Sequence, residues 1–394
     1  MKIGIVTGEF PPMEGGVGAY TQALAQALSN LGHELHIITS KSARPANFPQ
    51  KVQRLFQPFD IGYAQLHPHI RKWNWSAIGT IADIALRFDL DVVNIQYQAA
   101  AYHMRNPAIN LLPWRLKNVC NVIVTFHDLR VPYLFPKAGR LRKTAVRFMA
   151  QQAHGVITTN LDDKLQLEAQ VSTPVAQIPI GSNITAHIPN HIEIDEVKTR
   201  LKLEPTDYLL GYFGFLNDSK GADTLIRALA LLDERFHLVF IGGQTGASDS
   251  ANNAAFLRSL KSLIAQCRLT ERVHWTGFLS DRRVSAHLHA TDVIVMPYRD
   301  GSSLRRGTLM AAMAHKRPLI TTWPIVPTPE LAHQQNVWFV PVDDEDAIVT
   351  AVHKLADDPA LHALLGQGAG EVANLFTWDK IAQNTSRFFS RLSS

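Results

Sequence analysis

Short apolar runs recur along the first half of the chain, with segments of helical periodicity between several of them. The runs predict strands at Ile3–Thr7, Leu35–Thr39, Val92–Gln96, Val122–Phe126, Gly155–Thr159 and Val175–Ile180. After the first run, apolar residues recur at the spacing of one helix face. This predicted stripe consists of Val17, Tyr20, Leu24, Leu28 and Leu31. Strands that alternate with helices imply a parallel sheet with right-handed crossovers.

The same alternation restarts in the second half. It predicts strands at Tyr208–Phe213, Leu238–Ile241, Val273–Thr276, Val293–Met296, Pro318–Thr321 and Val337–Val340. Between the two halves, residues 183–206 are mostly polar and contain Pro189 and Pro205, which favours an interdomain connection. A chain of 394 residues also exceeds one ordinary α/β core. We therefore predict two doubly wound domains, and a closing helix capped by Thr377.

Composition and cysteine use favour an ordinary globular protein of a reducing compartment. Hydrophobic residues make up 46% of the chain and charged residues 19%, and no apolar run reaches the roughly 18 residues of a membrane-spanning helix. The N-terminus is typical of a first core strand, not of a signal peptide. Cys120 and Cys267 fall in different halves and have no metal-ligand spacing. A cytoplasmic location is the expectation.

Positive charge is concentrated in the first half. Residues 1–190 contain 18 Lys and Arg and 11 Asp and Glu, although the net charge of the whole chain is only +5. Arg140, Lys143 and Arg147 would share one helix face. That face could contact an anionic membrane surface, bind an anionic acceptor or simply be solvated. No nucleic-acid-binding motif is present, so we expect no nucleic acid partner.

Candidate ligand residues follow the ends of predicted strands, where ligands bind in such sheets. Gly15, Gly16 and Gly18 lead into the first predicted helix. Glycines there permit close backbone approach, and a helix start offers N–H groups to an anion. The alternative is a tight turn that only packs the helix on the sheet. The glycines do not form the G-x-G-x-x-G dinucleotide pattern.

The second half offers a fuller set of anion-binding residues. Gly214 ends a predicted strand, and Lys220 opens the next helix, where a lysine can neutralise phosphate. A solvent-exposed surface lysine is the alternative. Gly243 and Phe278 follow strands against which a nucleobase could lie. A diphosphate cradle at a further helix start is predicted from Ser302, Ser303, Arg305, Arg306, Gly307 and Thr308.

The order of these segments resembles glycosyltransferase family 4, whose members are retaining enzymes of the GT-B fold. The matching stretches are PPMEGGVGAYTQALAQALSNLGHELHIIT, TFHD, IPIGSN, the Lys220 loop, DVIVMP, AMAHKRPLIT, PELAHQQNVWFVPVDDEDAIVTAV and FTWDKIA. They cover essentially the whole chain. The resemblance implies two Rossmann-like domains that face a central cleft, an acceptor domain at 1–185, a linker at 186–206 and a nucleotide-sugar domain at 207–376. It also implies that the closing helix, about 377–394, packs back on the first domain.

The resemblance also implies roles for individual residues. Lys220 would hold the donor diphosphate, and the amides around Gly307 and Thr308 would bind its distal phosphate. Residues around Phe278 and Leu279 would border the base. Gly15, Gly16 and Gly18 would close the other side near the donor phosphates, and His127 would hydrogen-bond the transferred sugar. A histidine at a strand end that is satisfied by backbone is the alternative for His127.

Two departures from the family pattern stand out. Ser303 and Ala311 occupy the positions of the usual Glu-x7-Glu pair, and Phe215 occupies the position of an arginine. The first glutamate of the pair contacts the donor sugar in the family, and the second contacts the ribose. Our hypothesis is that Arg305 or Arg306, with Arg306 preferred, supplies the lost positive charge.

The function expected from this resemblance is transfer of a sugar from a nucleotide-diphosphate sugar to a glycan, lipid or small-molecule acceptor. Catalysis would rest on positioning and on stabilising the leaving diphosphate with cations and helix amides, so no metal is expected. Acceptor pockets would come from residues 96–107 and 128–139. Two alternatives are a degenerate homologue that binds without transferring sugar, and a sugar-nucleotide epimerase. An epimerase would need carboxylates such as those of Glu9, Glu14, Asp128 and Asp300.

Overall fold

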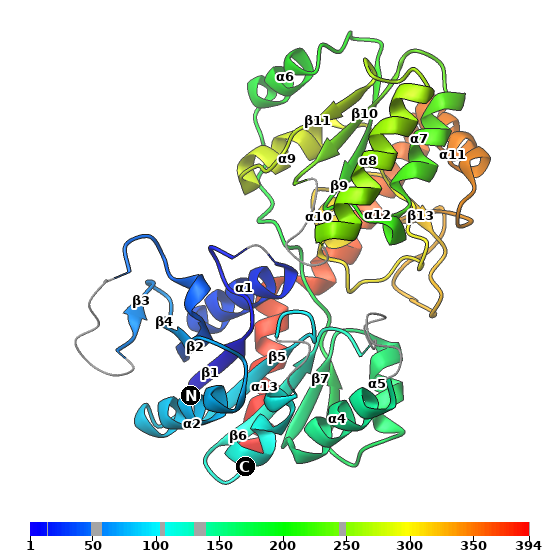
Figure 1. The fold of residues 1–394 in the computed structure, drawn as a ribbon. Coiled ribbons are helices and arrows are strands. Elements are labelled where there is room, and N and C mark those ends of the chain that lie inside the picture. The colour runs from blue at the N-terminus through cyan, green and yellow to red at the C-terminus, as the bar shows by residue number, and fades with distance from the viewer. Residues whose placement is uncertain (14, 49–56, 103–106, 130–138, 244–249, 394) are drawn as a thin grey trace. The chain divides into compact units, whose positions relative to one another are not determined.

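The chain folds into two compact units, each built around one sheet (Figure 1). The computed structural model describes residues 1–13, 15–48, 57–102, 107–129, 139–243 and 250–393. Unit 1 contains Met1–Ile180 and Trp378–Ser394, and unit 2 contains Gly181–Thr377. The first division therefore falls after Ile180, and the whole polar stretch expected as a linker belongs to unit 2.

The sheet of unit 1 has the strand order β3-β4-β2-β1-β5-β6-β7-β8. All neighbouring strands are parallel except β3, which runs antiparallel to β4. The strands are β1 (Lys2–Thr7), β2 (Glu34–Ser40), β3 (Phe59–Asp60), β4 (Gln65–Ile70), β5 (Val92–Tyr97), β6 (Asn121–Phe126), β7 (Gly155–Thr158) and β8 (Val175–Gln177). The six strands predicted for this half are present, and two were not predicted.

The two unpredicted strands lie at one edge of this sheet. In β4 the sequence QLHPHI breaks the apolar run with His67, Pro68 and His69. Only Gln65 and Leu66 pair with the short strand β3. Pro68 therefore lies beyond the end of β3, where its missing N–H leaves no ladder hydrogen bond unmade on that side.

Helices cover both faces of the unit 1 sheet. They are α1 (Gly16–Asn30), α2 (Trp75–Arg87), α3 (Leu112–Leu116), α4 (Gly139–Gln152), α5 (Leu161–Glu168) and α13 (Trp378–Ser393), with 3₁₀ turns η1 (Lys41–Ala43) and η2 (Ala108–Leu111). One core cluster joins the strands to α2, α3 and α4, and the other joins them to α1 and α13. Of the stripe predicted on α1, four residues are buried, but Leu31 is 42% exposed because it follows the last residue of the helix.

Unit 2 has a wholly parallel sheet with the order β11-β10-β9-β12-β13-β14. Its strands are β9 (Tyr208–Phe213), β10 (Phe236–Ile241), β11 (Val273–Trp275), β12 (Val293–Met296), β13 (Leu319–Thr322) and β14 (Trp338–Val340). All six were predicted, with small differences at their ends. The central strands β9 and β12 are neighbours, so the order reverses direction between them, as in doubly wound sheets.

The helices of unit 2 also form two layers. They are α6 (His191–Arg200), α7 (Ala222–Leu231), α8 (Ser250–Gln266), α9 (Asp281–Ala290), α10 (Gly307–Ala314), α11 (Glu345–Asp357) and α12 (Pro359–Ala373), with η4 (Asp218–Lys220) and η5 (Asn374–Phe376). One core cluster includes α6, α9 and α10, and the other includes α7, α8 and α11. Helix α6 lies inside the polar stretch and is closed at its start by a capping box of Asn190 and Glu193.

After Thr377 the chain leaves unit 2 and returns to unit 1 as α13. Helix α13 packs against α1 and β6. Its Ile381, Ala382 and Phe389 are at most 2% exposed. Within the described part of the chain, no helix is both long enough and apolar enough to cross a bilayer.

Candidate functional site

Lys220 lies at the carboxyl end of β9 in unit 2. It is the last residue of η4, and Gly221 after it caps the start of α7 in a left-handed conformation with φ 66°. The Lys220 ammonium donates to the Phe215 carbonyl oxygen at 2.6 Å. Burial and the nearby Arg306 lower the pKa of Lys220 to about 8, while Asp300 opposes the shift. A cation desolvated in this way gains strongly from an anionic partner.

Gly214 brings the end of β9 against the start of α10. Its φ is +119°, which L side chains rarely adopt. A Cβ atom there would lie 2.8 Å from Thr308 Cγ2 and 3.5 Å from Lys220 Nζ. The glycine therefore keeps open the space between the lysine and the first turn of α10. The structure thus brings together Gly214, Lys220 and Thr308, three of the residues that the sequence analysis proposed for donor binding.

Arg306 borders the same space. It is the residue before α10, its side chain is 15% exposed, and its guanidinium lies 3.9 Å from the centre of the Tyr298 ring. One guanidinium nitrogen, Nη2, donates to the Asp300 carboxylate. The Nε–H is buried and has no hydrogen-bond partner among the described residues. Arg306 thus retains a donor for a ligand, although Asp300 neutralises part of its charge.

The rest of the predicted cradle surrounds the start of α10. Ser302 is buried, and its hydroxyl has no partner among the described residues, whereas Ser303 and Arg305 are partly exposed. Gly307 is the first residue of α10, and a Cβ atom on it would come within 2.9 Å of Asn183. Ala311 is fully buried in the core of unit 2. At this position the chain therefore presents no polar group to a ribose.

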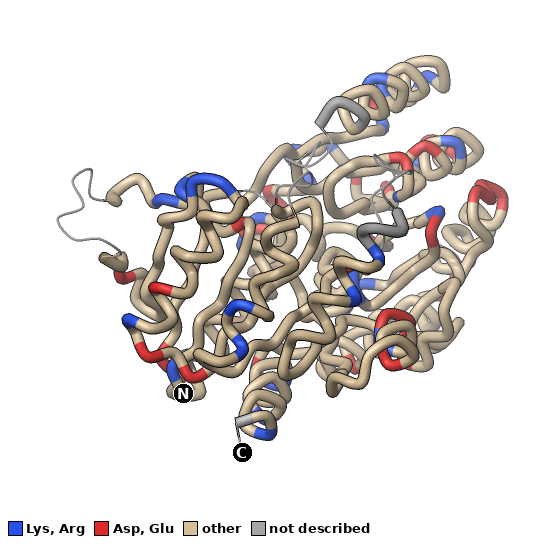
Figure 2. The backbone as a smooth tube through the Cα atoms, turned by 60° about the horizontal axis from the view of Figure 1, so that its bottom comes forward, with Lys and Arg blue, Asp and Glu red and all other residues tan. Residues whose placement is uncertain are grey.

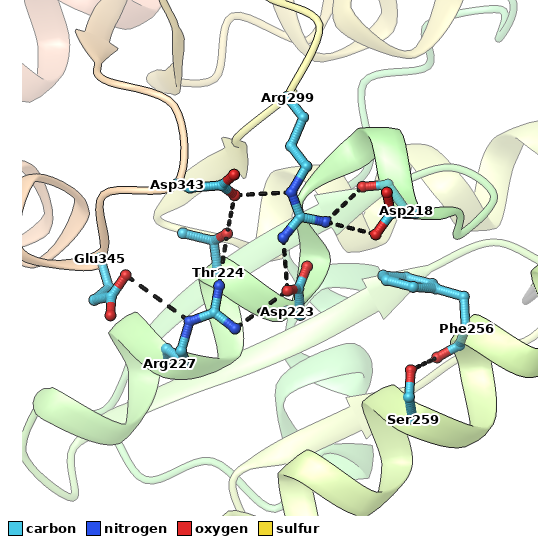
Figure 3. Close-up of polar contacts among 9 residues, drawn as sticks. All are labelled: Asp218, Asp223, Thr224, Arg227, Phe256, Ser259, Arg299, Asp343 and Glu345. Atoms are coloured by element: carbon cyan, nitrogen blue, oxygen red, sulfur yellow. Dashed lines mark hydrogen bonds and ion pairs between the residues drawn. The ribbon is translucent and has the colours of Figure 1, made fainter.

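An ion-pair network fixes the turn that carries Lys220 (Figure 3). The Arg299 guanidinium binds the carboxylates of Asp218 at 2.9 Å, Asp223 at 2.7 Å and Asp343 at 2.8 Å. Its backbone N–H also donates to the Ser219 carbonyl oxygen at 2.9 Å. Arg299 therefore connects η4, α7 and the loop that follows β14. None of these network residues was predicted from the sequence, because partners far apart in the chain carry no local signal.

The residues predicted to border the base follow β10 and β11. Gly242 and Gly277 form an isolated bridge between these segments. A Cβ atom on Gly243 would lie 2.9 Å from the Phe215 ring, so that ring lies over the Gly243 backbone. Phe278 is 75% exposed, whereas Leu279 packs against the core. The Phe278 ring is therefore accessible to a ligand at this edge of the sheet.

In unit 1 the glycine loop is already occupied by a buried carboxyl group, that of Glu9. The Glu9 carboxylate accepts a hydrogen bond from the Gly18 amide in the first turn of α1. Burial raises the pKa of Glu9, and the Gly18 hydrogen bond only partly opposes the shift. A Cβ atom on Gly15 would overlap this carboxylate at 1.6 Å, whereas Gly16 faces open space. The expectation that this helix start offers free N–H groups is therefore wrong for Gly18.

His127 follows the last residue of β6 and joins a chain of buried polar side chains. Gln96 donates from its amide nitrogen to Asn94, so its oxygen is the acceptor for His127 Nε2 at 2.9 Å. Burial lowers the pKa of His127 to about 4. The ring is therefore neutral near pH 7, with the proton on Nε2 and a lone pair on Nδ1. The alternative of a ring satisfied by backbone is therefore wrong, because the partner of Nε2 is the Gln96 side chain. Nδ1 can accept a hydrogen bond from a hydroxyl.

Several sequence expectations fall outside the described residues. Glu14 is one, and residues 103–106 and 130–138 of the expected acceptor loops are others, as is the side chain of Arg140. Lys143 and Arg147 on α4 are exposed. Of the carboxylates considered for an epimerase, Asp300 is paired with Arg306 and Glu9 with the Gly18 amide.

Matches to known protein families and relatives cover almost the whole chain. The family model described as Glycosyltransferase Family 4 matches residues 14–184, and the one described as Glycosyl transferases group 1 matches residues 207–358. An uncharacterized glycosyltransferase of Methanocaldococcus jannaschii is 21% identical over 400 residues, covering 98% of this chain and 97% of that protein. The D-inositol 3-phosphate glycosyltransferase of Streptomyces avermitilis is 28% identical over 202 residues, but this match spans 49% of this chain and 42% of that protein.

Solved structures agree on the fold. Sucrose-phosphate synthase from Thermosynechococcus elongatus has a TM-score of 0.77 at 19% identity, covering 100% of this chain and 99% of the other. HepE of Anabaena, in complex with UDP and glucose, has a TM-score of 0.75 at 14% identity, covering 99% and 100%. Both halves of the sequence, the two doubly wound sheets and these relatives lead to one assignment: the chain is a glycosyltransferase of family 4 with the GT-B fold.

Proposed function

We propose that the protein transfers a sugar from a nucleotide-diphosphate sugar to an acceptor, with retention of configuration at the anomeric carbon and without a metal ion. The observation that carries the proposal is the space beside Gly214, bordered by Lys220, Arg306 and the first turn of α10. A buried lysine, an arginine with an unused N–H and a helix N-terminus form a cradle for a diphosphate. The retaining outcome rests on membership of family 4.

The chemistry follows from where charge develops. As the bond between the anomeric carbon and the diphosphate breaks, negative charge grows on the phosphate oxygens and positive charge on the sugar. Lys220 and Arg306 would stabilise the departing diphosphate, which is where transition-state stabilisation acts. His127 would accept a hydrogen bond from a sugar hydroxyl through Nδ1, because its Nε2–H is engaged by Gln96.

Relatives support the nucleotide class of the donor. The solved structures of HepE contain UDP, UDP with glucose, and UDP-glucose. For this chain we propose only the class of donor, which is a sugar linked to uridine, guanosine or adenosine diphosphate. The acceptor would be a glycan, a lipid-linked saccharide or a small molecule. Exposed Lys143 and Arg147 on α4 support contact with an anionic membrane surface as a part of this proposal.

Thermal-shift titration with UDP, GDP, ADP and their sugar conjugates tests the proposal, with and without magnesium. A ligand that binds the folded state raises its melting temperature by mass action. We expect one nucleotide family to raise it without magnesium, and Lys220→Ala to abolish the shift. Arg282→Ala, which removes a side chain that is 70% exposed elsewhere in unit 2, is the control.

Other results would favour the two alternatives. Absence of a shift with every nucleotide would contradict the proposal and favour a homologue that has lost donor binding. A shift with conversion of the sugar nucleotide in the absence of any acceptor would favour the epimerase.

A further inference from the structure

Four cations of unit 1 gather at the carboxyl ends of β2 and β4. Strands β2 and β4 are parallel neighbours, and Ser40 pairs with Ile70 at the last position of the ladder. Lys41 follows Ser40 and Arg71 follows Ile70, so the two cations leave the sheet side by side. Arg44 and Lys72 extend the same two segments. Figure 2 shows Lys and Arg positions collected at the edge of this unit remote from the N-terminus.

No carboxylate balances this charge among the described residues. None of the four cations has an ion pair there. Burial lowers the pKa of Lys41, and the next causes are the positive charges of Arg71 and Arg44. The same field reaches His69, whose pKa is lowered by burial first and then by Arg44 and Lys41. Like charges held together in a folded protein are relieved by a bound anion.

Part of this cluster is already fixed in position. Arg44 Nε donates to the Pro68 carbonyl oxygen at 3.4 Å, and its guanidinium lies 4.6 Å from the centre of the Phe48 ring. Fixing a side chain before the ligand arrives reduces the entropy lost on binding. Among the described residues, the other N–H groups of Arg44 have no hydrogen-bond partner, and they form a planar set of donors suited to phosphate oxygens.

Helix α2 begins at Trp75, three residues after Lys72. Asn74 caps it by accepting from the Ser76 amide, and its first turn contains no acidic residue. The positive end of the helix dipole therefore adds to the four side-chain charges. Trp75, the first residue of α2, is 60% exposed. An exposed indole beside a cationic cluster offers an apolar face to a sugar or polyol ring.

We infer that Lys41, Arg44, Arg71 and Lys72 bind the phosphate group of a phosphorylated acceptor, whose ring would lie against Trp75. A phosphate monoester carries nearly two negative charges and several acceptor oxygens, which suits a group of four cations better than a single carboxylate does. The donor cradle of unit 2 is built on other residues, so these cations are not needed there. The inference deepens the proposed function by naming the acceptor class, and it rests on that function for the role of the bound molecule.

Calorimetric titration of the full chain tests the site without requiring turnover. The probes are inorganic phosphate, glucose 6-phosphate and glucose, with UDP, GDP and ADP titrated separately. The variant is the pair Arg71→Ala and Lys72→Ala, since both side chains are exposed and their loss should not prevent folding. The matched control is the pair Arg115→Ala and Lys117→Ala, which removes the same charge from another exposed part of unit 1.

We expect phosphate and glucose 6-phosphate to bind the parent protein, and glucose to bind far more weakly. The Arg71/Lys72 variant should lose about tenfold or more in affinity for both phosphates. The control variant should keep its affinity for both phosphates, and nucleotide binding should be unchanged in both variants. Equal weakening in the control variant, or equal binding of glucose and glucose 6-phosphate, would overturn the inference. Failure of UDP, GDP and ADP alike to bind, with phosphate binding intact, would contradict the proposed function and leave the phosphate site standing.

The phosphate monoester could belong to a free sugar phosphate or to a lipid headgroup. Sedimentation with phosphatidylcholine vesicles that contain phosphatidic acid separates the two sources. Loss of vesicle binding in the Arg71/Lys72 variant alone identifies a lipid phosphate, and binding of the free phosphates alone identifies a soluble acceptor. The inference fails if neither the soluble phosphates nor these vesicles bind.

Discussion

Arg306 is the residue that we expect to replace a cation that the family has and this chain lacks. The family arginine next to the glycine of the Lys220 loop is absent, since Phe215 stands there and its ring covers Gly243. Arg306, the residue before α10, borders the space beside Lys220, and its Nε–H has no hydrogen-bond partner among the described residues. Its positive charge is one of the causes that lower the pKa of Lys220, which places the two cations within electrostatic reach of each other.

We predict that Arg306→Ala weakens binding of the preferred nucleotide diphosphate by about tenfold or more, because a charge-assisted hydrogen bond is lost. Arg305→Ala should have a much smaller effect. Calorimetric titration measures both, and Arg306→Lys shows whether charge without the planar guanidinium is enough. Unchanged affinity in both alanine variants would refute compensation by either arginine.

Glu9 gives the second prediction at this scale. Burial raises its pKa, so the ionised carboxylate destabilises the folded state relative to the unfolded state. The folded state therefore binds the proton more tightly, and the destabilisation is present above the folded pKa and disappears as the pH falls to the unfolded value. Glu9→Gln, which retains an oxygen for the Gly18 amide, should raise the melting temperature at pH 8.

The pH dependence supplies the control for Glu9→Gln. Its advantage over the parent protein should shrink steadily as the pH is lowered from about 8 to about 4.5. Differential scanning calorimetry at several pH values measures this difference. An advantage that stays constant over the whole range would show that repacking, and not ionisation, causes it.

At the scale of elements, the apolar pattern was sufficient for strands that are buried on both faces. It failed for β4, where two histidines and Pro68 interrupt the run and the strand is specified by its pairing with β2. It also failed for α6, whose sequence is polar because little of its surface is buried, and whose start depends on a capping box instead. Local periodicity reports burial, so elements that bury little are poorly predicted.

In the candidate site, too, only the residues that carry a local sequence signal could be predicted. Gly214, Lys220 and the start of α10 were found because strand ends and helix starts carry local signals. Arg299 was missed because it acts through carboxylates from three separate elements. Glu9 was considered only as an acid–base group, since nothing local shows that its carboxylate reaches the Gly18 amide.

Arg299 should act as a positioning residue for the Lys220 turn. Arg299→Ala removes the side-chain ion pairs that connect η4, α7 and the loop after β14 and leaves only the backbone hydrogen bond to Ser219. We therefore expect nucleotide binding to weaken by about tenfold with only a modest fall in melting temperature. Arg227→Ala is the matched control, because Arg227 binds Asp223 and Glu345 in the same network without contacting η4. Equal losses of affinity in the two variants would mean that net charge, and not the position of η4, determines binding.

At the scale of the whole molecule, unit 1 is discontinuous in sequence. Its last helix, α13, is separated from the rest of the unit by all of unit 2. The apolar and polar spacing of the closing segment predicted a helix, but only the resemblance to family 4 indicated where it would pack. Local sequence carries no record of such a distant partner.

Unit 1 is shaped around α13 at several points. Gly155 in β7 has no side chain where a Cβ atom would lie 2.4 Å from Leu392 and 2.9 Å from Phe388. Trp378 meets the Tyr20 ring edge-on at 5.3 Å between ring centres. The His33 ring also lies 2.8 Å from the Ser386 hydroxyl. Removing α13 would therefore expose the apolar face of unit 1 that it covers and remove the contacts for which that face is shaped.

We predict that a chain ending at Thr377 retains a folded unit 2 and loses most of the stability of unit 1. Deleting a buried Phe or Ile side chain alone costs about 2–5 kcal/mol. For a unit of this size, the loss of several such side chains should lower the melting temperature by about 10 °C or more. Calorimetry of the truncated chain, and of residues 181–377 alone, measures the two transitions separately.

Phe389→Ala should lower the melting temperature of unit 1 only, whereas Arg387→Ala on the exposed side of α13 should change neither transition. A truncated chain that melts as the parent does would show that α13 contributes no stability to unit 1, and that its buried contacts are exchanged for others when it is absent.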